Sequence, residues 1–250
     1  MRSRDPDAAK ASGLRRFPPG PFAALDWDEP TPAPLPPMPS LADAPAVPPA
    51  SSPDAVPDPY DRDFPVPNGT PCTEEEFLTR YNDQGGVEYV DGRIDYLPVP
   101  SRRHQRIAAF LYDLLRDHFR GPGRRPDAEV NFAGLRVRTP GRFRDPDVTV
   151  LLDRDDPRAH NSHFDYADLC VEVVSPDDPQ RDLLEKRREY AAAGVPEYWI
   201  VDPRDDQRTV TVLRLTDGEY RGEPVGDGET VQSALLPGLS FAVTDCLNAR

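Results

Sequence analysis

The sequence predicts an α/β domain with a central mixed sheet flanked by helices, preceded by a disordered proline-rich tail. Of the 32 prolines, 18 fall within residues 1–67, where neither a helical nor a strand period is present. After this segment, apolar residues recur at helical spacing in some stretches and alternate in others. These stretches mix helices and strands too much for a β-sandwich, and they lack the regular strand–helix alternation of a doubly wound sheet.

Composition divides the chain into two parts. Residues 1–68 carry too few apolar side chains to offset the entropy cost of ordering, so we expect a disordered or polyproline-like tail. Residues 69–250 are then a single folded domain. The basic residues near the start are not followed by the apolar run of a secretory signal. No stretch approaches the ~20 apolar residues that span a bilayer, so we expect no membrane association.

Charge and cysteine content indicate the environment and the partners. Three widely spaced cysteines predict reduced thiols in a cytoplasm rather than a disulfide framework. The frequent Arg, Ala, Pro and Asp residues are typical of a GC-rich bacterial genome. A net charge of −14 argues against bulk binding of polyanions, but residues 100–144 hold 11 arginines against four acids. A solvated surface and a basic face that contacts nucleic acid are both open interpretations.

The first elements of the folded part have clear end signals. Thr73 and Glu76 can form a capping box, which predicts a helix. VEYVDGRIDYL alternates around Asp91 and Gly92, as in a β-hairpin with a two-residue turn. A second helix is expected to begin after Ser101, because apolar residues recur at three- and four-residue intervals. These apolar residues are Ile107, Phe110, Leu111, Leu114 and Leu115.

The remaining segments predict strands interrupted by one helix. Strand candidates lie at 130–132, 135–138, 148–152 and 169–174. QRDLLEKRREYAAAG is a helix that ends at a glycine. EYWIVDP is a buried strand ended by proline, and RTVTVLRLTDGEY alternates like a strand that enters another hairpin turn.

Glu172 interrupts the apolar strand DLCVEVV, and a buried carboxylate is costly unless something pairs with it. The strands RDPDVTVLL and ADLCVEVV flank a 14-residue connection, residues 153–166. If they pair antiparallel across it, Leu152 lies opposite Ala167. The same register places Asp147 opposite Glu172, with both side chains on one face. Two adjacent carboxylates repel unless a cation joins them, and Mg²⁺ suits such a pair.

Lys186 is the single lysine of the predicted folded domain, and Lys10 is the other lysine of the chain. It lies on the helix that follows the Glu172 strand. A compact ammonium can orient a water or contact a phosphoryl oxygen, which a planar guanidinium does poorly. The alternative is a surface lysine paired with Asp182 or Glu189, a contact worth roughly 0.2–0.5 kcal/mol.

Together these segments resemble the Uma2 family of restriction endonucleases, bacterial members of the PD-(D/E)XK nuclease superfamily. The resemblance rests on RDPDVTVLLD, on DLCVEVVSPDDPQRDLLEKRREYAAAGVPEYWIVDP, on VEYVDGRIDYLPVPSRRHQRI and on LLPGLSF. It covers about residues 70–245. It implies a restriction-endonuclease-like core for the folded domain.

The resemblance also implies a metal site. Asp147 and Glu172 would be the metal ligands, with the Val173 carbonyl as a third and Glu88 as an auxiliary acid. The superfamily pattern Glu-x-Lys places a lysine where this chain has valine. In such variants the next helix supplies the lysine, which makes Lys186 the substitute.

The same resemblance indicates residues near the substrate. His104 and Gln105 would contact the metal shell or a phosphate, although ordinary surface hydrogen bonding is an open alternative for both. Arginines of residues 102–144 would contact the phosphate backbone. The predicted nucleic-acid contacts are Arg102, Arg103, His104, Gln105 and Arg144.

The other motifs in the sequence do not indicate a function. HNSH, with His160 and His163, offers half of a zinc site, but no cysteine or acid has suitable spacing, so we expect a solvated loop. Cys170 lacks a histidine base and is expected to be an inert buried thiol. The sequence contains no phosphate-binding glycine loop and no Gly-x-Ser-x-Gly motif.

The sequence therefore predicts a Mg²⁺-dependent endonuclease that hydrolyses DNA phosphodiester bonds, with Mn²⁺ as an alternative metal. Lys186 would steady the nucleophile or the developing negative charge. One alternative is a catalytically silent nuclease-like scaffold that binds DNA or a protein, which Val174 at the lysine position favours. A phosphodiesterase acting on RNA or a small nucleotide would share the site. A homodimer and a protein partner for the proline-rich tail are further hypotheses.

Overall fold

The computed structural model describes residues 66–81, 84–121 and 123–250. The predicted tail, residues 1–68, therefore lies outside the described residues except for its last three. Of these, Val66 packs against a small aromatic cluster, and Asn68 Oδ1 accepts a hydrogen bond of 2.8 Å from Tyr96 N–H. In the described part of the chain, no helix is both long enough and apolar enough to cross a bilayer.

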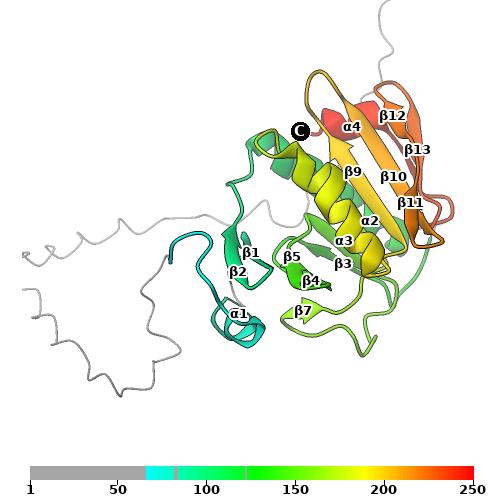
Figure 1. Cartoon of the computed structure of the whole chain (residues 1–250). Helices are drawn as coiled ribbons and strands as arrows, with labels where there is room; N and C mark the ends of the chain where they lie inside the picture. Colours follow the sequence, from blue (N-terminus) through cyan, green and yellow to red (C-terminus); the bar gives the residue numbers. More distant parts are fainter. Residues whose placement is uncertain (1–65, 82–83, 122) are drawn as a thin grey trace, which may run out of the picture. The chain divides into compact units, whose positions relative to one another are not determined.

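Along the chain, single helices separate runs of two to six strands (Figure 1). The helical elements are α1 (Glu74–Arg80), α2 (Arg102–Arg120), the π-helical turn η2 (Arg181–Glu185), α3 (Lys186–Ala192) and α4 (Val243–Leu247). The strands are β1 (Val87–Val90), β2 (Arg93–Tyr96), β3 (Glu129–Phe132), β4 (Arg136–Thr139), β5 (Arg142–Arg144), β6 (Val148–Leu151), β7 (His163–Phe164), β8 (Leu169–Val173), β9 (Glu197–Asp202), β10 (Thr209–Thr216), β11 (Glu219–Arg221), β12 (Pro224–Gly226), β13 (Thr230–Gln232) and β14 (Ser240–Ala242).

Two mixed sheets organise the described residues, where the sequence predicted one. The seven-stranded sheet has the order β11-β10-β9-β8-β6-β3, with β12 also paired to β10. In it β8 and β9 are parallel, whereas β6 and β8 are antiparallel. The five-stranded sheet has the order β2-β1-β5-β4-β7 and includes one parallel pair, β4 and β7. The predicted α/β class with mixed β-structure is confirmed.

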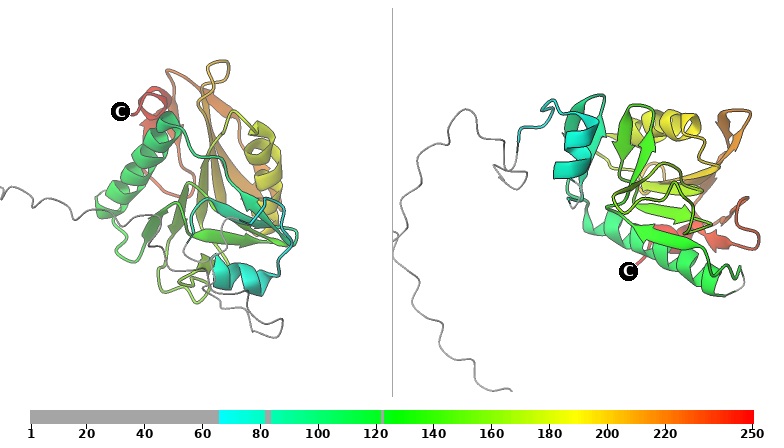
Figure 2. Two further views of the ribbon diagram at one scale, coloured as in Figure 1. Left: turned by 90° about the vertical axis from the view of Figure 1, so that its left-hand side faces the viewer. Right: turned by 90° about the horizontal axis from the view of Figure 1, so that it is seen from below.

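The seven-stranded sheet is covered on both faces. Figure 2 shows α2 in green and α3 in yellow on opposite sides of its strands. Val171 of β8 packs in a cluster with Leu111 of α2, whereas Cys170 packs with Tyr190 of α3. Because side chains alternate along a strand, Glu172 points to the same side as Cys170, toward α3.

The register between β6 and β8 is the predicted one. Val148 lies opposite Val171 in an antiparallel ladder. One residue beyond the end of that ladder, Asp147 comes opposite Glu172. The alternation of β8 supports this register, because a slip of one residue would turn Glu172 into the apolar cluster that faces α2.

Predicted helix ends and turns are also confirmed. Thr73 and Glu76 form the reciprocal capping box at the start of α1. Ser101 Oγ accepts the backbone N–H of His104 at 3.2 Å at the start of α2. The hairpin between β1 and β2 turns at Asp91 and Gly92, both with positive φ.

The helix that carries Lys186 differs from expectation at its beginning. It opens with the π-helical turn η2 before continuing as α3. Asp182 of η2 and Lys186 at the start of α3 are both buried. Single π-helical turns occur mostly at functional sites, and no residue pattern in the sequence marks this one.

Candidate active site

A cavity of about 670 Å³ lies at the carboxyl end of β8. Its walls come from the segment before α2, the beginning of α2, the residue that precedes β6, the end of β8 and η2. The carboxyl ends of neighbouring parallel strands, here β8 and β9, are a common place for ligand sites in α/β proteins. Six of the predicted site residues line this cavity: Arg103, His104, Asp147, Glu172, Val173 and Lys186.

Asp147 precedes β6 and is held at both carboxylate oxygens. Oδ1 lies 2.7 Å from His104 Nε2, and Oδ2 accepts the backbone N–H of Val173 at 2.7 Å. Burial opposes the charged form of His104, but the hydrogen bond with Asp147 and the negative charges of Asp147 and Asp182 together outweigh burial and raise the pKa of the imidazole. The Asp147 side chain remains 19% exposed, so it can contact a ligand in the cavity.

Glu172 is paired with the ammonium of Lys186 and the hydroxyl of Tyr190. The Glu172 Oε1 atom lies 2.8 Å from Lys186 Nζ and accepts a hydrogen bond of 2.8 Å from Tyr190. Burial raises the pKa of Glu172 well above its ordinary value. Lys186 opposes this effect, while the like charges of Asp182 and Asp147 add to it.

Lys186 is the buried cation of the site. Besides Glu172, its Nζ lies 3.4 Å from Asp182 and 3.6 Å from Glu88. Burial opposes its charge, but Glu172, Glu88 and Asp182 outweigh burial and raise its pKa, so the ammonium stays protonated. The side chain is 4% exposed, which excludes the surface lysine considered from the sequence.

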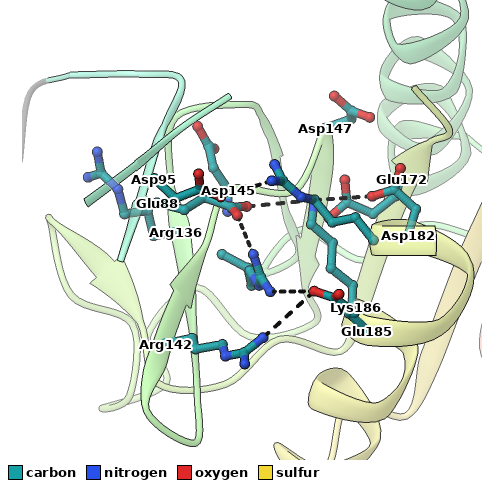
Figure 3. Close-up of polar contacts among 12 residues, drawn as sticks. Glu88, Asp95, Arg136, Arg142, Asp145, Asp147, Glu172, Asp182, Glu185 and Lys186 are labelled. Carbon is teal, nitrogen blue, oxygen red and sulfur yellow. Dashed lines mark hydrogen bonds and ion pairs between the residues drawn. The ribbon is translucent and has the colours of Figure 1, made fainter. Parts of the chain in front are cut away.

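Sequence reasoning named Asp182 only as a surface partner of Lys186 and missed its place among the buried acids of the site. Figure 3 shows Asp182, Glu172 and Lys186 converging from η2, β8 and α3, with Asp147 above them. Burial raises the pKa of Asp182 as well. The spacing of four residues between Asp182 and Lys186 was the available signal, but only the tertiary structure shows that both side chains face the cavity rather than solvent.

Two predicted site residues lie in the core behind the cavity. Arg144 is 1% exposed and donates to Glu88 at 2.5 Å and to Glu189 at 2.6 Å. The predicted contact of Arg144 with nucleic acid is therefore wrong for this structure. Glu88 is fully buried, contacts Arg144, Lys186 and the backbone N–H of Asp145, and does not line the cavity. Burial would raise the pKa of Glu88, but Lys186 and Arg144 outweigh it and lower the pKa.

The other predicted nucleic-acid residues lie at the start of α2. Arg102 and Gln105 are exposed, and Arg103 lines the cavity and pairs with the exposed Asp205 at 3.1 Å. Arg136, one of the 11 clustered arginines, is fully buried and donates to the backbone carbonyl of Val87. The local excess of arginine is therefore partly core structure and partly surface.

The described acidic side chains of the cavity do not form a cluster of three closely spaced metal ligands. Among the described residues, a single group of three His, Cys, Asp or Glu side chains has ligand atoms within 4.8 Å of one another, namely His160, His163 and Asp165. Asp147 and Glu172 thus have no third such side chain this close. The expectation that His160 and His163 lack an acidic partner is wrong, because the backbone turn brings Asp165 to both imidazoles.

The fold and the site define a protein of the restriction-endonuclease-like class. The chain belongs to the Uma2 family, since the model of that family, described as "putative restriction endonuclease", matches residues 74–244. The fold is similar to the crystal structure of a putative nuclease belonging to DUF820 from Anabaena variabilis, with a TM-score of 0.57 and 22% identity. That match covers 71% of this chain and 98% of the other. No curated protein matches the chain.

Proposed function

We propose that this protein is a Mg²⁺-dependent endonuclease that hydrolyses phosphodiester bonds in DNA. The observation that carries the proposal is the convergence of Asp147, Glu172 and the buried Lys186 at one cavity. Membership in a family described as putative restriction endonucleases supports nuclease activity. The choice of metal and of DNA as substrate is the part that experiment must test.

The residues at the cavity fit a hard divalent cation. Asp147 and Glu172 would hold it, with the Val173 carbonyl and waters completing the oxygen ligands that Mg²⁺ prefers. Burial and the like charge of Asp182 both raise the pKa of Glu172. A cation bound at the carboxylate would offset both effects and favour its charged form. When bound, the ion would polarise the scissile phosphate and lower the pKa of the attacking water.

The chain's own side chains supply position and charge. His104 and the Val173 N–H orient the two oxygens of Asp147. Lys186 stays protonated, so it is suited to stabilising negative charge on the phosphate or to orienting the nucleophile, and unsuited to taking up a proton. Arg102 and Arg103, at the start of α2, are placed to contact the phosphate backbone.

The proposal also includes a cytoplasmic location and a homodimeric assembly. The three cysteines are free thiols, of which Cys170 and Cys246 are buried. This supports a reducing bacterial cytoplasm, where the substrate would be DNA. A homodimer is a prediction that sedimentation analysis can test.

The test is plasmid nicking by the full chain with Mg²⁺, Mn²⁺ or Ca²⁺, on supercoiled, linear and single-stranded DNA and on RNA. Asp147→Asn and Glu172→Gln should each lower the nicking rate by at least about a hundredfold, because each removes a charge that holds the cation. Asp155→Asn, which changes an exposed acid, is the matched control and should cut normally. Thermal melting verifies that all variants are folded.

Two results would contradict the proposal. The first is a wild-type protein that cuts no DNA with any of these metals. The second is normal cutting by both Asp147→Asn and Glu172→Gln. Cleavage of RNA alone would retain the metal site and reassign the substrate.

A further inference from the structure

Three metal-ligand side chains meet outside the cavity, in the connection from β6 to β8. His160 Nε2 lies 3.1 Å from Asp165 Oδ2, and His163 Nε2 lies 3.3 Å from Asp165 Oδ1. One ligand atom of each residue lies within 4.8 Å of the others. None of the three lines the cavity that holds Asp147 and Glu172.

The backbone builds this cluster. His160 N–H donates to the His163 carbonyl at 2.9 Å, which closes the turn HNSH and brings the two imidazole centroids within 4.8 Å. His163 belongs to β7, which pairs with β4 at the edge of the five-stranded sheet. Its ring packs edge-on against Phe143. One ligand is therefore anchored in the fold, while His160 and Asp165 remain partly exposed.

Ser162 supports the orientation of His163. Its Oγ lies 2.9 Å from His163 Nδ1. A histidine that binds a metal usually has its other ring nitrogen hydrogen-bonded in this way, which sets the tautomer. A proton on Nδ1, donated to Ser162, leaves the lone pair of Nε2 on the side where Asp165 lies.

We propose that His160, His163 and Asp165 bind a divalent transition-metal ion, for which Zn²⁺ is the best match. Zinc takes imidazole nitrogen and carboxylate oxygen at about 2.0–2.2 Å, so a tetrahedral site separates its ligand atoms by about 3.4 Å. The two His–Asp separations are close to that value, but they involve different oxygens of Asp165. A small side-chain rotation would therefore bring one ring nitrogen of each histidine and one carboxylate oxygen, all within 4.8 Å of one another, onto one ion. The nitrogen donors distinguish this site from the all-oxygen site proposed for Mg²⁺ in the cavity.

The charges around the cluster are compatible with a cation. Arg138 Nε lies 2.7 Å from Asp165 Oδ1, and Arg138 also contacts the carboxylate of Glu74, so its charge is shared between two acids. This leaves Oδ2, the oxygen nearest His160, for an ion.

The expected role of this site is to stabilise the connection of residues 153–166. β7 is the only strand within that connection, and the ion would hold it to the adjacent turn. The strands on either side of the connection, β6 and β8, position Asp147 and Glu172. The inference does not depend on the nuclease proposal, because it rests on other residues.

The test uses Co²⁺, whose visible absorption reports coordination by imidazole and carboxylate. The full chain carrying Asp147→Asn is titrated with Co²⁺, because this substitution weakens competing binding in the cavity. We expect one equivalent of Co²⁺ to give visible bands that Zn²⁺ abolishes by displacement. Adding His160→Gln should remove these bands, and adding Ser162→Ala should weaken binding by roughly tenfold or more.

Asn161→Ala is the matched control, because it alters the same turn without removing a ligand, and it should bind Co²⁺ as tightly as its parent. Zn²⁺ should also raise the Tm of the Asp147→Asn protein and leave the Tm of the His160→Gln double variant unchanged. Because His160 is 45% exposed, its replacement should leave the fold intact, which circular dichroism verifies. Failure of the Asp147→Asn protein to bind Co²⁺, or unchanged bands after His160→Gln, would overturn the inference.

Discussion

At the scale of single residues, the main feature is one ammonium among three carboxylates. Lys186 contacts Glu172, Asp182 and Glu88, and all four side chains are buried. Burying charges costs free energy that mutual attraction offsets only with close contacts. Because three acids surround one lysine, the site has excess negative charge, which favours the binding of a cation. The same charge repulsion lowers the stability of the fold.

Lys186→Met should abolish cleavage and destabilise the protein. The substitution leaves Glu172, Asp182 and Glu88 without their shared cation, which we expect to lower the free energy of unfolding by about 3–5 kcal/mol. Urea unfolding of the variant without added metal measures this loss. Arg188→Ala, an exposed cation on the same helix, should change the free energy by less than about 0.5 kcal/mol.

A double variant sharpens this test. Adding Glu172→Gln to Lys186→Met removes one of the carboxylates that lost its cation. Part of the lost free energy of unfolding should therefore be regained. Equal unfolding free energies for Lys186→Met and wild type would show that the buried ion pairs contribute little.

Glu88 predicts a pH dependence of stability. Lys186 and Arg144 lower its pKa below the ordinary value of 4.5, so its contribution to stability is present above that value. The contribution is lost as the pH falls through the folded-state pKa. The difference in unfolding free energy between wild type and Glu88→Gln should therefore shrink below about pH 4.5, in urea unfolding from pH 7 to pH 3. A difference that stays constant over this range would contradict the assignment.

At the scale of elements, α3 carries Lys186, the proposed catalytic lysine, and its C-terminal end depends on a glycine. Gly194 follows its C-cap with φ +79°, a left-handed conformation that glycine adopts without strain. A Cβ added at this position would meet no heavy atom within 4 Å. The backbone conformation alone therefore decides the effect of a substitution here.

Gly194→Ala should lower the free energy of unfolding by about 1–2 kcal/mol, which is the cost of the left-handed conformation for alanine. Gly194→Asn is the matched control and should lose less, because asparagine tolerates this region better. Chemical denaturation of the three proteins measures the order. If alanine were as stable as glycine, backbone strain would not limit the end of α3.

The pairing of β6 with β8 is the second element on which the site depends. Both strands are fully buried, and β6 begins and β8 ends at the cavity. Their alternation determines which side chains face α2, and it thereby turns Glu172 toward the helix that carries Lys186. Asp147, the residue before β6, contacts His104 of α2 instead.

At the scale of the whole molecule, the described residues that line the cavity all lie between Gly86 and Asp206. We therefore expect a fragment of residues 66–250 to melt at the same temperature as the full chain and to cut DNA equally well. A fragment of residues 69–250 would lose the hydrogen bond from Tyr96 to Asn68, worth about 1 kcal/mol, and should melt slightly lower. Differential scanning calorimetry compares the three chains. Loss of folding in the longer fragment would contradict the predicted domain boundary.

By itself, the sequence determined the features that depend on local chemistry and on periodicity. The capping box of Thr73 and the turn at Asp91 and Gly92 follow from residues close in sequence. Antiparallel pairing of two apolar strands across the 14-residue connection predicted the register that places Asp147 opposite Glu172, and the structure has this register. The scarcity of lysine led to Lys186, which the structure places 2.8 Å from Glu172.

Only the tertiary structure decided the features that depend on contacts between distant segments. It buries Arg144 between Glu88 and Glu189, although an arginine is usually exposed. It divides the described strands into three sheets, two of them mixed and one the antiparallel pair β13 and β14. A π-helical turn directs Asp182 toward Lys186. These outcomes depend on which groups from distant segments come into contact and on how far each group is removed from solvent. Both quantities determine the free energy of a buried charge.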